Sequence, residues 1–212
     1  EESKVDVLKN IIDKYVLRIN NAPAAPQEKM KIQLQNWLME LASCEIEETL
    51  DPRTKESAQM EYMMAEMMTR VEIKDKMSEE DKKTQLYIAI QRALFKLDPP
   101  IISYHLLESN YPEWHNLSFE KLNDVAKNIY LIWEKIEKDL RHPMAEKFYR
   151  ICEQYDTLYL ILGDVLSEDT PQAEEKFNDP EKLEGAIKKA YEKRFKQLKT
   201  RLKRAAVFST LS

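Results

Sequence analysis

The sequence predicts an all-α, bundle-like domain of seven or eight helices that ends in a long basic helix. Apolar residues recur every three or four positions over most of the 212 residues, which is the period of a helix face. Strong helix formers such as Glu, Lys, Leu, Met and Ala fill the same stretches. Only two glycines are present, Gly163 and Gly185, which argues against tight hairpins and phosphate-cradling loops.

The first three predicted helices are separated by stretches that contain proline. The first helix begins at Ser3, a candidate N-cap, and the two prolines within residues 20–26 end it. The second helix is expected over residues 27–49. The Asp-Pro dipeptide at 51–52 is interpreted as an N-cap followed by proline at the first helical position. The third helix then continues to about Lys76.

A capping-box pattern marks the start of the fourth predicted helix. Ser78 is followed three positions later by Asp81, in place of the usual Glu or Gln. The proline pair at 99–100 ends this helix, because proline cannot continue it. Further helices are expected over residues 101–108, 119–141 and 144–165.

The chain divides by composition into three parts. Residues 1–166 are predicted to form a helical core domain. Residues 167–180 (SEDTPQAEEKFNDP) hold five acidic residues and two prolines, and are predicted to be an exposed linker. Residues 181–212 are predicted to form the basic C-terminal helix. Within them, positions 182–204 contain ten basic and two acidic residues, a net charge of +8. The rest of the chain therefore carries a net charge of −13, which brings the total to −5.

This charge asymmetry indicates a polyanion or an anionic membrane surface as a partner of the last helix. An alternative is a solvated basic helix that packs on the acidic remainder of the chain. Nucleic acid is the least favoured partner, because few aromatic residues interleave the cations and the rest of the chain would repel phosphates. The residues expected to face the membrane are Lys188, Lys189, Lys193, Arg194, Lys196, Lys199, Arg201, Lys203 and Arg204.

The uncharged run at positions 205–211 favours the membrane interpretation. It is too short to span a bilayer, which takes about 20 residues. A basic helix leading into an apolar run is typical of the cytoplasmic flank of a membrane segment, which we expect to follow. The leading hypothesis is therefore a non-enzymatic helical interaction or scaffold domain at the cytoplasmic face of a membrane. It would bind a protein partner and need no cofactor.

The stretch QMEYMMAEMMTR concentrates five of the nine methionines on one helical face. The favoured interpretation is a packing face. A second hypothesis is a soluble adaptor that binds a partner helix, because methionine is common on surfaces that accept several partners. A copper site is disfavoured, since no His or Cys occurs between Cys44 and His105. The candidate partner-binding residues are Met60, Met63, Met64, Met67 and Met68, together with Tyr111 and Trp114 from an aromatic loop. These two aromatic residues are alternatively expected to plug the end of the core.

Two pairs of residues carry a further hypothesis, a helical-bundle metalloprotein or enzyme. His105 and Glu108 form an H-x-x-E pair, and Asp139 and His142 form a D-x-x-H pair. A di-iron bundle has Glu-x-x-His on each of two helices, so the order is reversed in the first pair and the acid is shorter in the second. The alternative for His142 is a capping role at a helix end, because Pro143 follows it.

Overall fold

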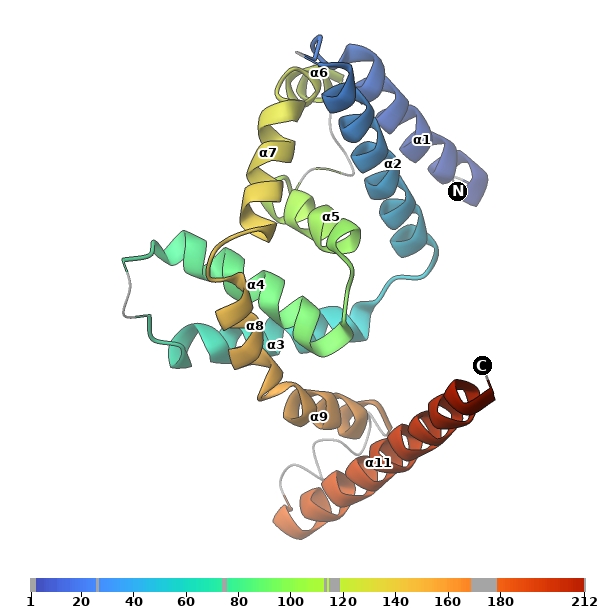
Figure 1. The fold of residues 1–212 in the computed structure, drawn as a ribbon, viewed down its shortest axis with the longest axis vertical. Helices are drawn as coiled ribbons and strands as arrows, with labels where there is room; N and C mark the ends of the chain where they lie inside the picture. Colours follow the sequence, from blue (N-terminus) through green and yellow to red (C-terminus); the bar gives the residue numbers. More distant parts are fainter. Residues whose placement is uncertain are drawn as a thin grey trace. The chain divides into compact units, whose positions relative to one another are not determined.

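The computed structural model describes residues 3–25, 27–73, 76–112, 114, 119–168 and 179–211. These residues form ten helices and no strand among them, so the predicted all-α class is confirmed, with a helix count slightly above the expected seven or eight (Figure 1). The chain divides into two compact units, residues 1–152 and residues 153–212.

The first three helices are α1 (Lys4–Asn21), α2 (Glu28–Leu50) and α3 (Thr54–Arg70). The predicted N-cap at Ser3 is confirmed, because its hydroxyl accepts a hydrogen bond from the backbone N–H of Asp6 at 3.2 Å. The expected cap at the Asp-Pro dipeptide is wrong. Asp51 instead ends α2, with its N–H donating to the Glu47 carbonyl at 2.9 Å. The third helix also stops well short of Lys76, because the chain becomes extended at the buried Val71.

The next helices are α4 (Glu79–Phe95) and α5 (Pro99–Asn110). Ser78 caps α4 as predicted, accepting from the Asp81 N–H at 3.0 Å. Lys96 ends α4 in the left-handed conformation, with φ at 54°. The proline pair then occupies the first turn of α5. Proline is tolerated there because the backbone N–H that it lacks would have no partner within the helix.

Two helices that the sequence predicts as continuous are each divided in two. The expected helix over 119–141 becomes α6 (Phe119–Lys127) and α7 (Ile129–Leu140), with Asn128 between them. The Asn128 side-chain nitrogen donates to the Asp124 carbonyl at 2.9 Å, which satisfies a carbonyl at the end of α6. The expected helix over 144–165 becomes α8 (Ala145–Glu153) and α9 (Asp156–Glu168).

The first unit is held by a core that runs through α1, α2, α5, α6 and α7. Helix α2 packs on α1 and α5, α1 packs on α6, and α5 packs on α7. Helix α3 pairs with α4, and α4 also contacts α7. The largest apolar side chains at the centre are fully buried, among them Leu34, Leu38, Leu41, Leu107 and Trp114.

The described part of the second unit contains α9 and α11 (Pro180–Leu211). Ile161 and Val165 of α9 pack against Ala190 of α11. Residues 153–166 therefore belong with the basic helix, whereas the sequence places them in the core domain. Pro180 opens α11 as predicted. Positions 169–178 of the predicted linker lie outside the described residues.

Candidate functional site

Helix α11 presents an apolar face that its contact with α9 leaves about half exposed. We call it the apolar stripe: Ile187, Tyr191, Phe195, Leu198 and Leu202. These side chains lie three or four positions apart, on one side of the helix, and are between 39% and 62% exposed. The Tyr191 and Phe195 rings stack on each other with centroids 6.3 Å apart. The packed contact with α9 instead uses Leu183, Ala186 and Ala190, on the neighbouring side of the helix.

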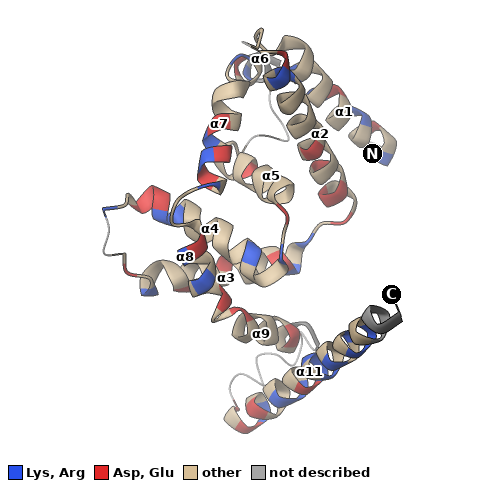
Figure 2. Ribbon diagram, in the orientation of Figure 1, with Lys and Arg blue, Asp and Glu red and all other residues tan. Residues whose placement is uncertain are grey.

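Basic residues line the rest of α11 (Figure 2). All nine of the predicted membrane-facing cations lie on this helix, and eight of them are exposed. The exception is Arg194, which is half-buried. Its Nη2 donates to Asp164 Oδ1 at 2.9 Å and to the Leu160 carbonyl at 3.2 Å. Arg194 therefore fastens α11 to α9 within the second unit.

A groove of about 320 Å³ lies between α9 and α11. Its lining combines Phe195 and Leu198 of the apolar stripe with the guanidinium of Arg201. A groove lined by both apolar and cationic side chains suits an amphiphile with an anionic head. Over the described residues, no helix is both long enough and apolar enough to cross a bilayer.

The methionine face of α3 is mainly a packing surface. Met63 is fully buried and Met67 nearly so, while Met60, Met64 and Met68 are half-buried. Met60 and Met64 line a groove of about 490 Å³ together with residues of α4 and α5, including Tyr87 and Leu106. On the methionine face of α3, Met60 and Met64 therefore face a groove, whereas Met63 and Met67 point into the interior.

The aromatic residues of the predicted binding loop differ in placement. Trp114 is fully buried, and Tyr111 is half-buried against the same core. The backbone N–H of Trp114 donates to the Tyr111 carbonyl at 2.8 Å. Trp114 thus lies within the core and is shielded from an external partner.

Charged side chains of α1 and α2 form a buried group around Trp114, which we call the Glu45 cluster: Lys14, Tyr15, Arg18, Glu45 and Trp114. Glu45 accepts hydrogen bonds from Lys14, from Tyr15 Oη at 2.8 Å and from Trp114 Nε1 at 3.0 Å. The Arg18 guanidinium lies over the Trp114 ring, 3.9 Å from its centroid. Arg18 Nη1 also donates to the Lys14 carbonyl at 2.8 Å. Within the part of the chain that the structure describes, Arg18 Nε and Nη2 have no hydrogen-bond partner.

Burial controls the protonation of this cluster. It lowers the pKa of Lys14, against the opposing attraction of Glu45. It also lowers the pKa of Arg18 to about 10, which leaves the guanidinium charged at neutral pH. Burial and the Glu45 charge together raise the pKa of the Tyr15 hydroxyl. The cluster therefore joins α1, α2 and the Trp114 segment through paired charges inside the core.

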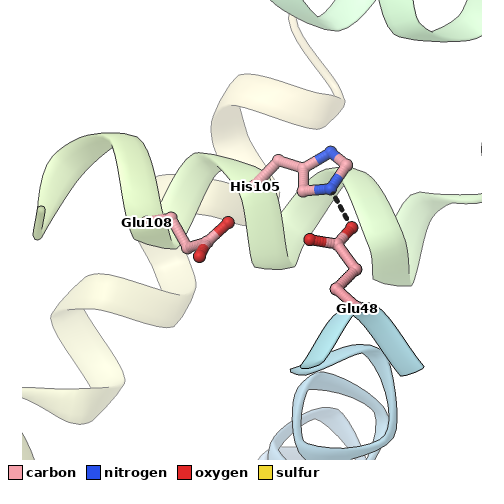
Figure 3. A group of neighbouring side chains, drawn as sticks. All are labelled: Glu48, His105 and Glu108. Carbon is pink, nitrogen blue, oxygen red and sulfur yellow. Dashed lines mark hydrogen bonds and ion pairs between the residues drawn. The ribbon is translucent and has the colours of Figure 1, made fainter. Parts of the chain in front are cut away.

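A second polar group lies at the contact between α2 and α5 (Figure 3). Glu48 of α2 and His105 and Glu108 of α5 each offer one ligand atom, and these atoms lie within 4.8 Å of one another. His105 Nε2 is in hydrogen-bond contact with Glu48 Oε1. The His105 and Glu48 side chains are only 14% and 24% exposed. The structure thus joins the predicted pair of His105 and Glu108 to a third residue, Glu48.

The other predicted pair does not belong to this group. The backbone carbonyl of Asp139 accepts a hydrogen bond from Gln85 Nε2 at 2.8 Å, and burial raises the pKa of the Asp139 carboxyl. His142 Nδ1 accepts from the Met144 N–H at 3.2 Å, at the corner between α7 and α8. This is a local turn contact, in keeping with the capping alternative for His142.

The sequence interpretation missed Arg18, Glu45 and Glu48. A signal for them exists, because Arg18 follows the buried Ile11 and Tyr15 at helical spacing. Glu45 likewise continues the buried face of Leu38 and Leu41. Polar residues that fall on an apolar face are candidates for buried, paired groups.

No protein-family model matches the chain, and no curated protein or solved structure matches it either. The function must therefore be inferred from the geometry and charge of these surfaces.

Proposed function

We propose that this protein is a non-enzymatic helical interaction domain whose helix α11 binds an anionic membrane surface. One observation carries the proposal: α11 exposes an apolar stripe on one side and lysines and arginines around the rest of its surface. A helix of this kind lies in the membrane interface, with its apolar side toward the acyl chains and its cations among the headgroups. The cytoplasmic leaflet carries the anionic lipids, so the proposal is that α11 binds on that side.

The energies of the two contributions are of similar size. Burying the exposed half of the five side chains of the stripe contributes about 4–7 kcal/mol, at roughly 1.5–3 kcal/mol for each complete side chain. Each basic residue held near an anionic surface adds about 1 kcal/mol at most. Neither contribution alone gives tight binding, so the proposal requires both the apolar stripe and the cations.

Sedimentation with lipid vesicles tests the proposal. The chain is expected to sediment with vesicles rich in phosphatidylserine and to remain in solution with neutral phosphatidylcholine vesicles. Added salt weakens the binding, because it screens the headgroup charge. Phe195→Ser with Leu198→Ser removes the apolar contribution, and Lys196→Glu with Lys203→Glu reverses part of the charge.

Matched controls lie in the first unit. Leu131 of α7 is an exposed leucine and Lys147 of α8 an exposed lysine, so Leu131→Ser and Lys147→Glu make the same chemical changes away from α11. These variants are expected to bind like the unaltered chain. Equal binding by all variants, or equal binding to neutral and anionic vesicles, rejects the role assigned to α11.

A further inference from the structure

The tautomer of the His105 ring is set by Gln91, a fully buried residue of α4. Gln91 Nε2 donates to the Tyr87 carbonyl at 3.3 Å, which turns its Oε1 toward His105 Nδ1. An amide oxygen only accepts hydrogen bonds, so Nδ1 must carry a proton. In the neutral ring, the other nitrogen, Nε2, then presents a lone pair.

That lone pair faces carboxylate oxygens. Nε2 is in contact with Glu48 Oε1, and Glu108 adds a second carboxylate from the next turn of α5 (Figure 3). Glu108 is held in place by Tyr104, whose hydroxyl donates to Oε1 at 2.9 Å. Acceptor atoms within 4.8 Å of one another repel unless a cation lies between them.

Two cations are chemically suitable, a proton on Nε2 or a metal ion. Lys14 pairs with Glu45 and also attracts Glu108 electrostatically, whereas a cation between Nε2 and the two carboxylates would serve all three groups. The arrangement around His105 resembles that of metal-binding histidines, which donate their second N–H to an oxygen of the surrounding protein. In this chain Gln91 supplies that oxygen, and Tyr104 orients one of the carboxylates in the same way.

We propose that Glu48, His105 and Glu108 bind one divalent transition-metal ion of the Zn²⁺ type. Zinc bonds of about 2.0–2.2 Å to N and O require ligand atoms about 3.3 Å apart, so the two glutamate side chains would rotate when the ion binds. The imidazole ligand favours Zn²⁺ and its neighbours over Mg²⁺ and Ca²⁺, which prefer oxygen ligands only. Three protein ligands leave the fourth position to water. The bound ion links α2 to α5 and is independent of the membrane function proposed for α11.

Titration of the full chain with Zn²⁺ alone, monitored by calorimetry, tests the site. We expect one ion per chain and a higher unfolding temperature with zinc present. Glu48→Gln and His105→Ala are each expected to weaken binding at least tenfold. Gln91→Leu, which removes only the orienting oxygen, is expected to weaken it about tenfold. Co²⁺ in place of zinc should give the visible absorption of a low-symmetry site in the unaltered chain and lose it in Glu48→Gln.

Control variants are His142→Ala, which removes a histidine outside the group, and Glu40→Gln, which removes an exposed carboxylate of α2. Both are expected to bind zinc like the unaltered chain. If His105→Ala does not fold, Glu48→Gln still tests whether this group binds zinc, because it preserves the shape of a partly exposed side chain. The proposal is overturned if the unaltered chain binds no zinc, which leaves the proton as the cation. It is also overturned if Glu48→Gln binds zinc as tightly as Glu40→Gln does.

Discussion

The Glu45 cluster and helix α11 use the same residue types in opposite ways. In the cluster, Lys14 and Arg18 are buried beside Glu45 and two aromatic rings. On α11, lysines and arginines surround an apolar stripe that remains exposed. Buried charges must be paired within the fold, whereas exposed cations contribute to a surface potential that attracts an external anion. The difference separates charge that stabilises the protein from charge that is available for binding.

The same contrast holds for the apolar residues of the two units. In the first unit, the leucines of α2 are covered by α1 and α5. In the second unit, α9 covers only one side of α11, which leaves Phe195, Leu198 and Leu202 exposed. The described residues of the second unit leave this apolar row about half exposed among the cations. It therefore supports binding as the role of this surface.

The largest expected effect on stability comes from Glu45→Gln. This change leaves Lys14 and Arg18 buried without their counter-charge, so the free energy of unfolding should fall by about 3–5 kcal/mol. Urea denaturation followed by circular dichroism measures this loss. Glu47→Gln is the matched control, because Glu47 is an exposed residue of the same helix. Its ion pair with Arg53 contributes about 1 kcal/mol at most to the unfolding free energy. Equal losses in the two variants would contradict the structural role of the cluster.

Met63→Ala should have the next largest effect. Met63 is fully buried, so its truncation leaves a cavity and costs about 2–5 kcal/mol of unfolding free energy. Met64 lies one position further along α3 and lines the groove, and Met64→Ala is expected to cost clearly less. The same urea experiment compares the two. A larger loss for Met64→Ala would show that the groove side of α3 is the packed side.

The helices were predictable because burying one face of a helix imposes a period of three to four residues on the sequence. The caps at Ser3 and Ser78 were predictable as well, because a capping hydroxyl and its target are close in sequence. The breaks at Asn128 and between α8 and α9 were not. No proline or glycine marks either position, so the sequence carries no standard break signal at either one.

The candidate sites were only partly predictable for a related reason. The sequence identified the basic character of α11 and the pair of His105 and Glu108, which are local patterns. Glu48 is 57 positions away from His105, and only the packing of α2 on α5 brings them together. The partners of Glu45 likewise come from two separate segments, α1 and the segment of Trp114. Contacts over such separations leave no fixed spacing in a single sequence.

The buried thiols of the first unit should make its stability dependent on pH. Burial raises the pKa of Cys152 from 9.0 to about 12. Above pH 9 the unfolded chain loses this proton while the folded chain keeps it, so the unfolding free energy falls as the pH rises. The loss is at most about 1.4 kcal/mol per pH unit. Urea denaturation at several pH values above 9 measures the slope. Cys152→Ala should reduce this slope, and identical slopes in the two proteins would exclude the thiol as its source.

The smallest expected effect on stability is that of the apolar stripe. Phe195→Ser and Leu202→Ser should change the unfolding free energy by about 0.5 kcal/mol or less, because both side chains are already exposed. Ile161→Ser is the matched change at a buried position of the same unit and should cost several times more, since it places a hydroxyl in the contact between α9 and α11. Thermal unfolding followed by circular dichroism compares the three variants. If the stripe variants were as destabilising as Ile161→Ser, the stripe would belong to a packed interior. The membrane proposal would then lose the exposed apolar face on which it depends.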